Sequence, residues 1–113
     1  MEIHYKRPFA QFVKKASKAL QLAIEDQVYE ICRTPSLGVQ KSGDLKDFLI
    51  HKFYFNRQEY LIAYRHSRKT ETIDIVWIDF YKVGNHENFY IELKRFIRQE
   101  KDSHHQYTHD KRE

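Results

Sequence analysis

The hydrophobic pattern of the chain changes its period once, near Gly43, and this change limits the fold more than any other feature. Before it, apolar residues recur at intervals of three and four, the period of an amphipathic helix. They are Phe9, Phe12, Val13, Ala16, Leu20, Ala23, Ile24, Val28 and Ile31. The spacing fits either one long helix or a hairpin of two helices broken near Ser17, and it ends at the segment from Pro35 to Gly38.

After Gly43 the sequence is rich in aromatic and β-branched residues, which favour strands. Three such runs cover residues 48–55, 59–65 and 72–83, with a turn at 56–58 and a polar stretch at 66–71 between them. Ile73, Ile75 and Trp77 occupy alternate positions in the third run. Because the connections are short, the three strands are expected to form an antiparallel meander. A short strand at residues 3–5 precedes the helical region.

The segment that follows the third strand predicts a last helix. Gly84 closes the strand, and Asn85 is expected to cap the helix. The apolar stripe of this helix consists of Phe89, Leu93, Phe96 and Ile97. Residues 99–113 are polar, so a disordered tail is expected there. The predicted fold is α+β, in the order β-α(α)-β-β-β-α, with a helix or helical hairpin packed on a small antiparallel sheet in a domain of residues 1–98.

Composition narrows the class of protein. The 113 residues fit one domain, and 20 Lys and Arg against 16 Asp and Glu give a net charge of +4, which permits a polyanionic partner without requiring one. Cys32 is the only cysteine, which excludes an intrachain disulfide. No apolar stretch approaches the ~20 residues that span a bilayer. Residues 1–5 show no signal-peptide core, so we expect a cytoplasmic protein without a membrane partner.

Motifs for cofactor chemistry are absent from the sequence. It has no phosphate-binding glycine loop, no dinucleotide glycine pattern, no zinc-ligand spacing and no nucleophile elbow, and it contains only 3 glycines. We therefore expect no metal or cofactor. The remaining candidates for chemistry are basic, imidazole and phenol side chains on the meander and where it ends.

His86 is the first candidate. It follows the expected helix cap, where backbone N–H groups favour an anion, and an imidazole exchanges protons near neutral pH. Tyr90 comes one helical turn later, so its ring is expected near His86, where a phenol can stack on a base. A surface histidine and a core tyrosine are the alternatives.

Charged residues on the predicted strands form a second group. Arg65 ends the second strand, and a guanidinium can bind a phosphate through two hydrogen bonds. Lys52 and His51 are adjacent on the first strand, so they point to opposite faces of the sheet. Glu59 opens the second strand as a possible base, and a solvated strand edge is the alternative for each of these residues. A weaker basic patch on the first helical region consists of Lys14, Lys15 and Lys18.

Four segments together resemble the RelE/ParE superfamily, the toxins of type II toxin–antitoxin systems. They are Gly43-Asp44-Leu45, His51-Lys52-Phe53, residues 59–65 (EYLIAYR) and residues 84–90 (GNHENFY). The resemblance covers roughly residues 3–98, and the closing segment is its most specific part. The chain departs from these toxins in one respect, because they usually end soon after the aromatic residue that corresponds to Tyr90, whereas a full helix follows here.

The resemblance implies a metal-free, ribosome-dependent endoribonuclease that cleaves mRNA in the ribosomal A site and so inhibits translation. In this reaction the ribose 2′-OH attacks the neighbouring phosphorus and expels the 5′-oxygen of the next nucleotide. By resemblance, Arg65 and Lys52 (or His51) bind the phosphate, His86 transfers a proton and Tyr90 stacks on the scissile nucleotide, with Glu59 as a reserve base.

The resemblance also leaves rival functions open. A ParE-type toxin shares the fold but poisons DNA gyrase without nuclease activity, and a non-catalytic nucleic-acid-binding module is a third possibility. The family implies a cognate antitoxin as partner, together with the ribosome and mRNA or, in the alternative, DNA gyrase.

Overall fold

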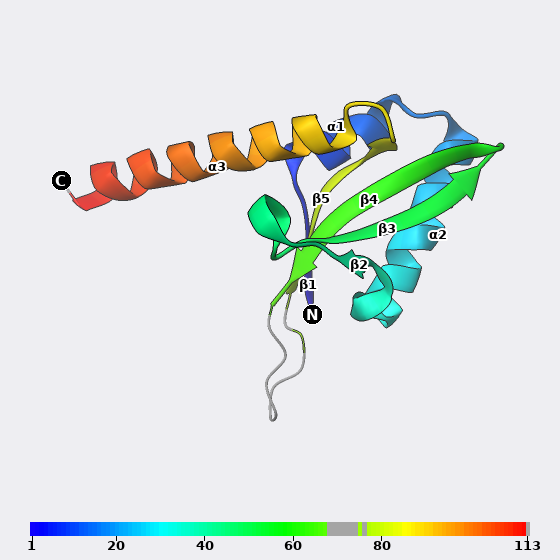
Figure 1. Cartoon of the computed structure of the whole chain (residues 1–113), viewed down its shortest axis with the longest axis horizontal. Helices are drawn as coiled ribbons and strands as arrows, with labels where there is room; N and C mark the ends of the chain where they lie inside the picture. The colour runs from blue at the N-terminus through cyan, green and yellow to red at the C-terminus, as the bar shows by residue number, and fades with distance from the viewer. Residues whose placement is uncertain (68–74, 76, 113) are drawn as a thin grey trace.

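The chain folds around one mixed five-stranded sheet (Figure 1). The computed structural model describes the backbone of residues 1–67, 75 and 77–112, and the side chains of these residues up to residue 101. The strands lie side by side in the order β1-β5-β4-β3-β2. Their bounds are β1 Glu2–Tyr5, β2 Val39–Gln40, β3 Leu49–Phe55, β4 Gln58–His66 and β5 Trp77–Asn85. β3, β4 and β5 pair antiparallel, which confirms the meander and the α+β class.

The sheet is not the purely antiparallel one that was expected, because β1 runs parallel to β5. Ile3 lies opposite Ile78, and His4 lies opposite Asp79. Parallel neighbours need a long connection, and here the helices and the meander supply it. Of the third predicted strand, residues 72–74 and 76 lie outside the described residues.

Asn56 and Arg57 form the two-residue turn between β3 and β4. Their φ angles are 53° and 67°, both in the left-handed region, as a type I′ turn requires. The twist of this turn matches that of the strands it joins, and asparagine tolerates the conformation better than most residues. The predicted turn is confirmed, with Gln58 already part of β4.

Two helices, rather than one, cover the first face of the sheet. They are α1 Arg7–Lys15 and α2 Lys18–Arg33. The Ser17 hydroxyl accepts a hydrogen bond from the Leu20 backbone N–H at 3.2 Å, so Ser17 caps α2. The hairpin alternative is therefore the observed one, and we call the surface beneath it the α1/α2 face.

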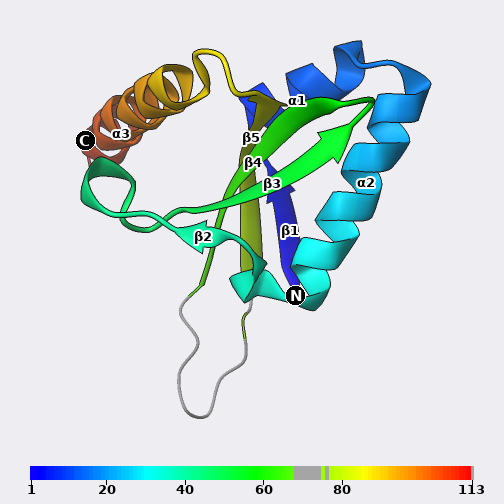
Figure 2. The same cartoon turned by 45° about the vertical axis from the view of Figure 1, so that its right-hand side comes forward.

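The last helix, α3 Phe89–Arg112, covers the opposite face, called here the α3 face (Figure 2). The Leu93 side chain is fully buried against the sheet. β5 continues through Asn85, whose backbone lies opposite Tyr60, so the prediction that Asn85 caps the helix is wrong. Asn88, with φ 58°, leads the chain into α3 instead.

α3 does not end near Arg98, as its apolar stripe predicted. Glu100 accepts a hydrogen bond from the Tyr81 hydroxyl at 2.9 Å and pairs with the Lys6 ammonium at 2.8 Å. Glu100 thus packs on the domain through polar contacts, which an apolar pattern in the sequence cannot reveal. The domain boundary at residue 98 stays a prediction. Within the described part of the chain, no helix is both long and apolar enough to cross a membrane.

Candidate functional site

The α3 face carries most of the charged candidates. Leu61, Ala63 and Arg65 alternate along β4, so all three side chains point to this face. Lys52 lies opposite Leu61 on β3 and shares that orientation. Simple strand alternation therefore gathers cations from two strands on one surface.

His51 lies on the other side of the sheet. Its Nε2 is 2.7 Å from Oε1 of Gln27 on α2, and burial lowers the pKa of the imidazole. Of the adjacent pair His51 and Lys52, only Lys52 is on the α3 face, as the alternation of a strand requires. His51 thus contacts the helical hairpin and is separated from Arg65 by the sheet.

Arg65 lies near the end of β4 among aromatic rings and one carboxylate. Its guanidinium carbon is 5.1 Å from the ring centre of Tyr81 and 5.6 Å from that of Phe48. Its Nε is buried, 4.0 Å from Oδ2 of Asp79, and has no hydrogen-bond partner among the described residues. The stem of the side chain is thus held by packing, while 35% of the side chain remains exposed.

Asp79 is the buried charge at this end of the sheet, with 8% of its surface exposed. Its Oδ1 is 2.7 Å from Nδ1 of His4, and Nε2 of His4 is 3.0 Å from Glu2. Hydrogen bonds to Asp79 and Glu2 raise the pKa of His4. Asp79 therefore lies between two basic groups, His4 on β1 and Arg65 on β4.

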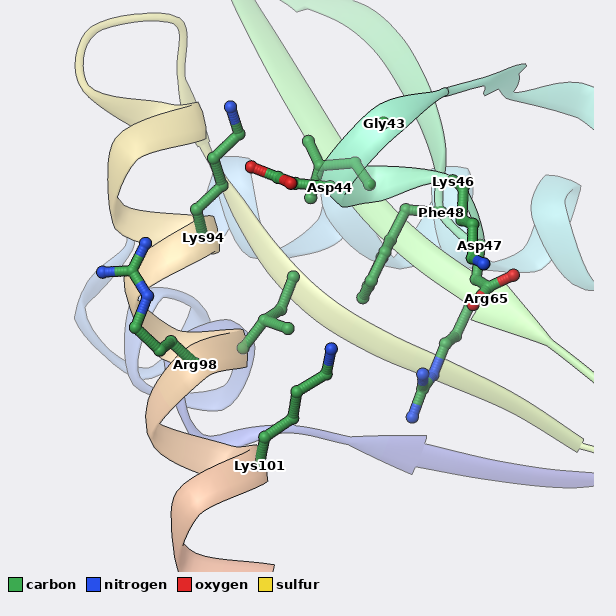
Figure 3. A pocket seen from close by; sticks show the side chains of 11 residues that line it. Gly43, Asp44, Lys46, Asp47, Phe48, Arg65, Lys94, Arg98 and Lys101 are labelled. Carbon is green, nitrogen blue, oxygen red and sulfur yellow. The ribbon is translucent and has the colours of Figure 1, made fainter.

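A groove of about 420 Å³ opens beside Arg65, between α3 and the short 3₁₀ turn η2 (Gly43–Leu45). Five cations line it: Lys46, Arg65, Lys94, Arg98 and Lys101. Figure 3 shows Arg65, from the sheet, and Lys101, from α3, reaching into the same space. Among the described residues that line the groove, the carboxylates are those of Asp44 and Asp47, so positive charge exceeds negative by three there.

His86 lies in the turn between β5 and α3 and is exposed. The prediction that it directly follows the helix cap is wrong, because α3 begins only at Phe89. Its ring is nevertheless close to Tyr90, with ring centres 6.1 Å apart in an edge-to-face arrangement. The Lys41 ammonium lies 5.4 Å from the centre of the Tyr90 ring. An imidazole, a phenol and an ammonium group thus lie close to one another at this turn.

The predicted set of catalytic residues divides into two groups. The Lys52 ammonium is 3.8 Å from a carboxylate oxygen of Glu59. Because Tyr60 lies opposite Asn85, this pair is at the end of the sheet from which the His86 turn leaves. Arg65 lies six residues after Glu59 in β4, which is about 20 Å along a strand.

The basic patch on the helical hairpin is separate from both groups. Lys14, Lys15 and Lys18 are exposed on α1 and α2, on the other side of the sheet from Arg65. Lys14 and Lys18 border a mainly apolar groove beside Tyr5 and Leu22. The structure does not bring these lysines together with the α3 face.

Comparison with known proteins identifies the family. The family model described as the ParE-like toxin of type II bacterial toxin-antitoxin systems matches residues 3–94. The chain belongs to this toxin family. No curated protein and no solved structure matches it. As the toxin of a type II system, it has a cognate antitoxin as partner.

The matched segment ends within the toxin's last helix. It includes β1 from Ile3 and all of the other strands, and it stops at residue 94, so two of the cations that line the groove, Arg98 and Lys101, lie beyond it. Arg98 and Lys101 therefore lie on the long last helix, the feature in which this toxin differs from the proteins that it resembles.

Sequence reasoning missed several residues of the toxin's site. Asp79 and Lys82 are single charges inside the apolar run of β5, and a charge in such a run is a signal that could have found them. The Lys82 ammonium pairs with Glu92 of α3 at 2.9 Å, with only 15% of the lysine side chain exposed. Lys41 carries no comparable signal. Among the described residues, no three His, Cys, Asp or Glu side chains are grouped as metal ligands would be.

Proposed function

We propose that this toxin inhibits translation by cleaving mRNA on the ribosome, through attack of a ribose 2′-OH on the adjacent phosphorus. The observation that carries the proposal is the cluster at one end of the α3 face. There the imidazole of His86, the ring of Tyr90 and the Lys41 ammonium surround one exposed turn. The Lys52–Glu59 pair lies at the same end of the sheet.

These groups match the needs of the reaction. The 2′-oxygen must lose a proton as it bonds to phosphorus, and the departing 5′-oxygen must gain one. Glu59 is suited to accept the first proton, and His86 is suited to donate the second. Lys52 would balance the charge that develops on the phosphoryl oxygens, and Tyr90 would stack on the neighbouring base. The products are a 2′,3′-cyclic phosphate and a free 5′-hydroxyl.

In this proposal Arg65 does not bind the scissile phosphate, which is the role that the resemblance implied for it. About 20 Å of strand separates it from the Glu59 end, so one phosphodiester cannot contact both. Arg65 would instead bind the RNA backbone several nucleotides from the scissile bond. Its role is in affinity, while His86 acts in the chemical step.

Primer extension on mRNA from a reconstituted translation system tests the proposal. The purified toxin should produce breaks in phase with ribosome position and leave naked mRNA nearly intact. His86→Ala should abolish the breaks without changing the melting temperature. Strong cleavage of naked RNA, or intact mRNA on programmed ribosomes, would contradict the proposal.

Gyrase poisoning is the second candidate function, and one observation favours it. The residues predicted to act on one phosphate are spread along the α3 face, and Arg65 is engaged by Asp79 instead of facing His86. A ParE-type toxin needs no converging catalytic set. Inhibition of gyrase supercoiling by purified toxin, with mRNA intact on ribosomes, would support this function and exclude the nuclease.

A further inference from the structure

Among the described residues that line the groove between η2 and α3, cations outnumber carboxylates, and most of these cations form no ion pair. Lys82, Lys6 and Lys52 on the rest of the α3 face are each paired with a glutamate at 2.8–3.8 Å. Around the groove, the described residues provide no ion pair for four cations. These are Lys46, Lys94, Arg98 and Lys101. Positive charge is therefore concentrated where it can contact a ligand.

The spacing of the cations on α3 keeps them on one side of the helix. Lys94, Arg98 and Lys101 follow each other at intervals of four and three, so they form a row along the groove. Like charges at this spacing repel each other and destabilise a helix. An anion bound along the row would relieve that repulsion, which a neutral ligand would not do.

The groove also continues past Arg65. A second hollow of about 550 Å³ shares Lys46, Asp47 and Arg65 with the first and extends to His66 and Trp77. Trp77 is only partly buried, so its indole is available to a ligand. The path thus leads from a row of cations on α3, over Arg65, to an aromatic ring.

We propose that this groove binds the phosphodiester backbone of single-stranded RNA. Cations along a groove, followed by a ring on which a base can stack, are the two features by which proteins bind single strands without reading their sequence. Lys94, Arg98 and Lys101 neutralise successive phosphates, and Trp77 stacks on a base beyond Arg65. The inference rests on the proposed function for the identity of the polymer, but it concerns binding and not cleavage.

The lining of the groove favours RNA over an acidic protein segment. An amphipathic acidic helix needs an apolar strip for its apolar face. Among the described lining residues, Leu45 and Phe48 are buried in the core beneath α3, and Ile97 is the one other apolar side chain. Phosphates, in contrast, need only the cations.

Fluorescence anisotropy with the full chain tests this inference. The probe is a fluorescein-labelled single-stranded RNA with 2′-O-methyl riboses, which cannot be cleaved by 2′-OH attack. The test variant is Lys94→Gln/Arg98→Gln/Lys101→Gln. The control, Arg33→Gln/Arg57→Gln/Arg95→Gln, removes the same charge from exposed arginines outside the groove, one of them on α3 itself.

Affinity is measured over a series of salt concentrations. Each phosphate contact contributes about 0.7 to the slope of log affinity against log salt for a single strand. The groove variant should therefore lose about 2 from this slope and at least tenfold in affinity at low salt, while the control keeps the slope of the parent. Both variants should melt like the parent, because the altered side chains are exposed.

Three results would overturn the inference. They are equal losses in both variants, no loss in the groove variant, and no binding of the RNA by the parent. Poly-glutamate that binds the parent and loses affinity only in the groove variant, without RNA binding, would assign the groove to an acidic protein. If the RNA data hold but mRNA stays intact on ribosomes, the proposed function fails and the groove remains an RNA site.

Discussion

The two faces of the sheet are held to their helices in different ways. On the α1/α2 face, Ile62, Tyr64 and Phe80 are fully buried in a continuous apolar core. The buried Tyr64 hydroxyl is satisfied as well, because it donates to the Pro35 carbonyl at 2.6 Å and accepts from the Gly38 N–H at 2.8 Å. This face is a closed core.

On the α3 face the apolar centre is smaller and ion pairs surround it. Leu61 and Leu93 are buried, but Lys82 pairs with Glu92 at one side of them, and Lys6 pairs with Glu100 nearer the end of the helix. Partly exposed ion pairs contribute little stability. The larger apolar core therefore lies on the α1/α2 face, whereas the α3 face carries the charged groups that a ligand can contact.

The largest expected effect is at His86, where the difference between the faces predicts a loss of activity without a loss of stability. His86→Ala should lower the rate of mRNA cleavage by about 10²–10⁴-fold, the range for a positioned acid or base. The exposed neighbour provides a control, because Asn85→Ala should leave the rate unchanged. Single-turnover cleavage on programmed ribosomes measures both. A folded His86→Ala protein that remains fully toxic would show that His86 takes no part in the reaction.

A second pair of variants compares the stability of the two faces directly. Ile62→Ala on the α1/α2 face should cost about 2–5 kcal/mol, because it leaves a cavity in a closed core. Glu92→Gln on the α3 face removes a partly exposed ion pair and should cost less than about 1 kcal/mol. Urea denaturation measures both free energies of unfolding. Similar costs would show that the two faces stabilise the fold equally.

A third variant sharpens the division within the α3 face. Arg65→Ala should weaken RNA binding about tenfold, the loss expected for one charge-assisted hydrogen bond, and so raise KM. The kcat should stay near that of the parent, because Arg65 lies about 20 Å from the Glu59 end. Steady-state kinetics separate the two constants. A fall in kcat with unchanged KM would show that Arg65 acts on the scissile phosphate instead.

Two histidines should give the two faces opposite dependence on pH. The pKa of His4 is raised by Asp79 and Glu2, so its contribution to stability is present below its ordinary pKa and is lost as pH rises through the raised value. The pKa of His51 is lowered by burial, so the folded state loses stability as pH falls below the ordinary pKa of histidine.

Thermal melts between about pH 5 and pH 8 check these signs. His4→Asn should cost most at the acidic end, whereas His51→Asn should cost most at the alkaline end. Parallel curves for the two variants would show that neither histidine changes its pKa on folding.

The smallest effect is expected at the far end of α3. Removing residues 102–113 keeps Glu100 and its contacts with Tyr81 and Lys6, so the free energy of unfolding should change by no more than about 0.5 kcal/mol. A melt followed by circular dichroism measures it. A larger loss would show that these residues stabilise the domain.

Local chemistry allowed much of the fold to be predicted from the sequence. The change of hydrophobic period separated the helical region from the meander, because side chains repeat every 3.6 residues in a helix and every 2 in a strand. Asn56 and Arg57 predicted a turn, and Pro35 with Gly38 ended the helical region. The alternation of side chains along a strand was enough to predict that Lys52 and His51 lie on opposite sides of the sheet.

For other features the local signal was ambiguous or misleading. The pattern allowed either one helix or a break near Ser17. The structure has two helices, because the Ser17 hydroxyl caps the second one by accepting a hydrogen bond from the Leu20 N–H. Asn85 resembled a helix cap, but ladder pairing with Tyr60 outweighed that local preference. The resemblance grouped Arg65 with His86, although strand register separates them.

The main helical region, the three strands of the meander and the residue types available for chemistry could be predicted from the sequence, because they depend on neighbours in the chain. Which of those residues meet, and that α3 continues to Arg112, became clear only from the folded structure. The parallel pairing of β1 with β5 sets His4 beside Asp79, and the packing of α3 sets Lys94 and Lys101 across from Arg65. Such meetings depend on strand register and helix packing between distant segments, which no local pattern encodes.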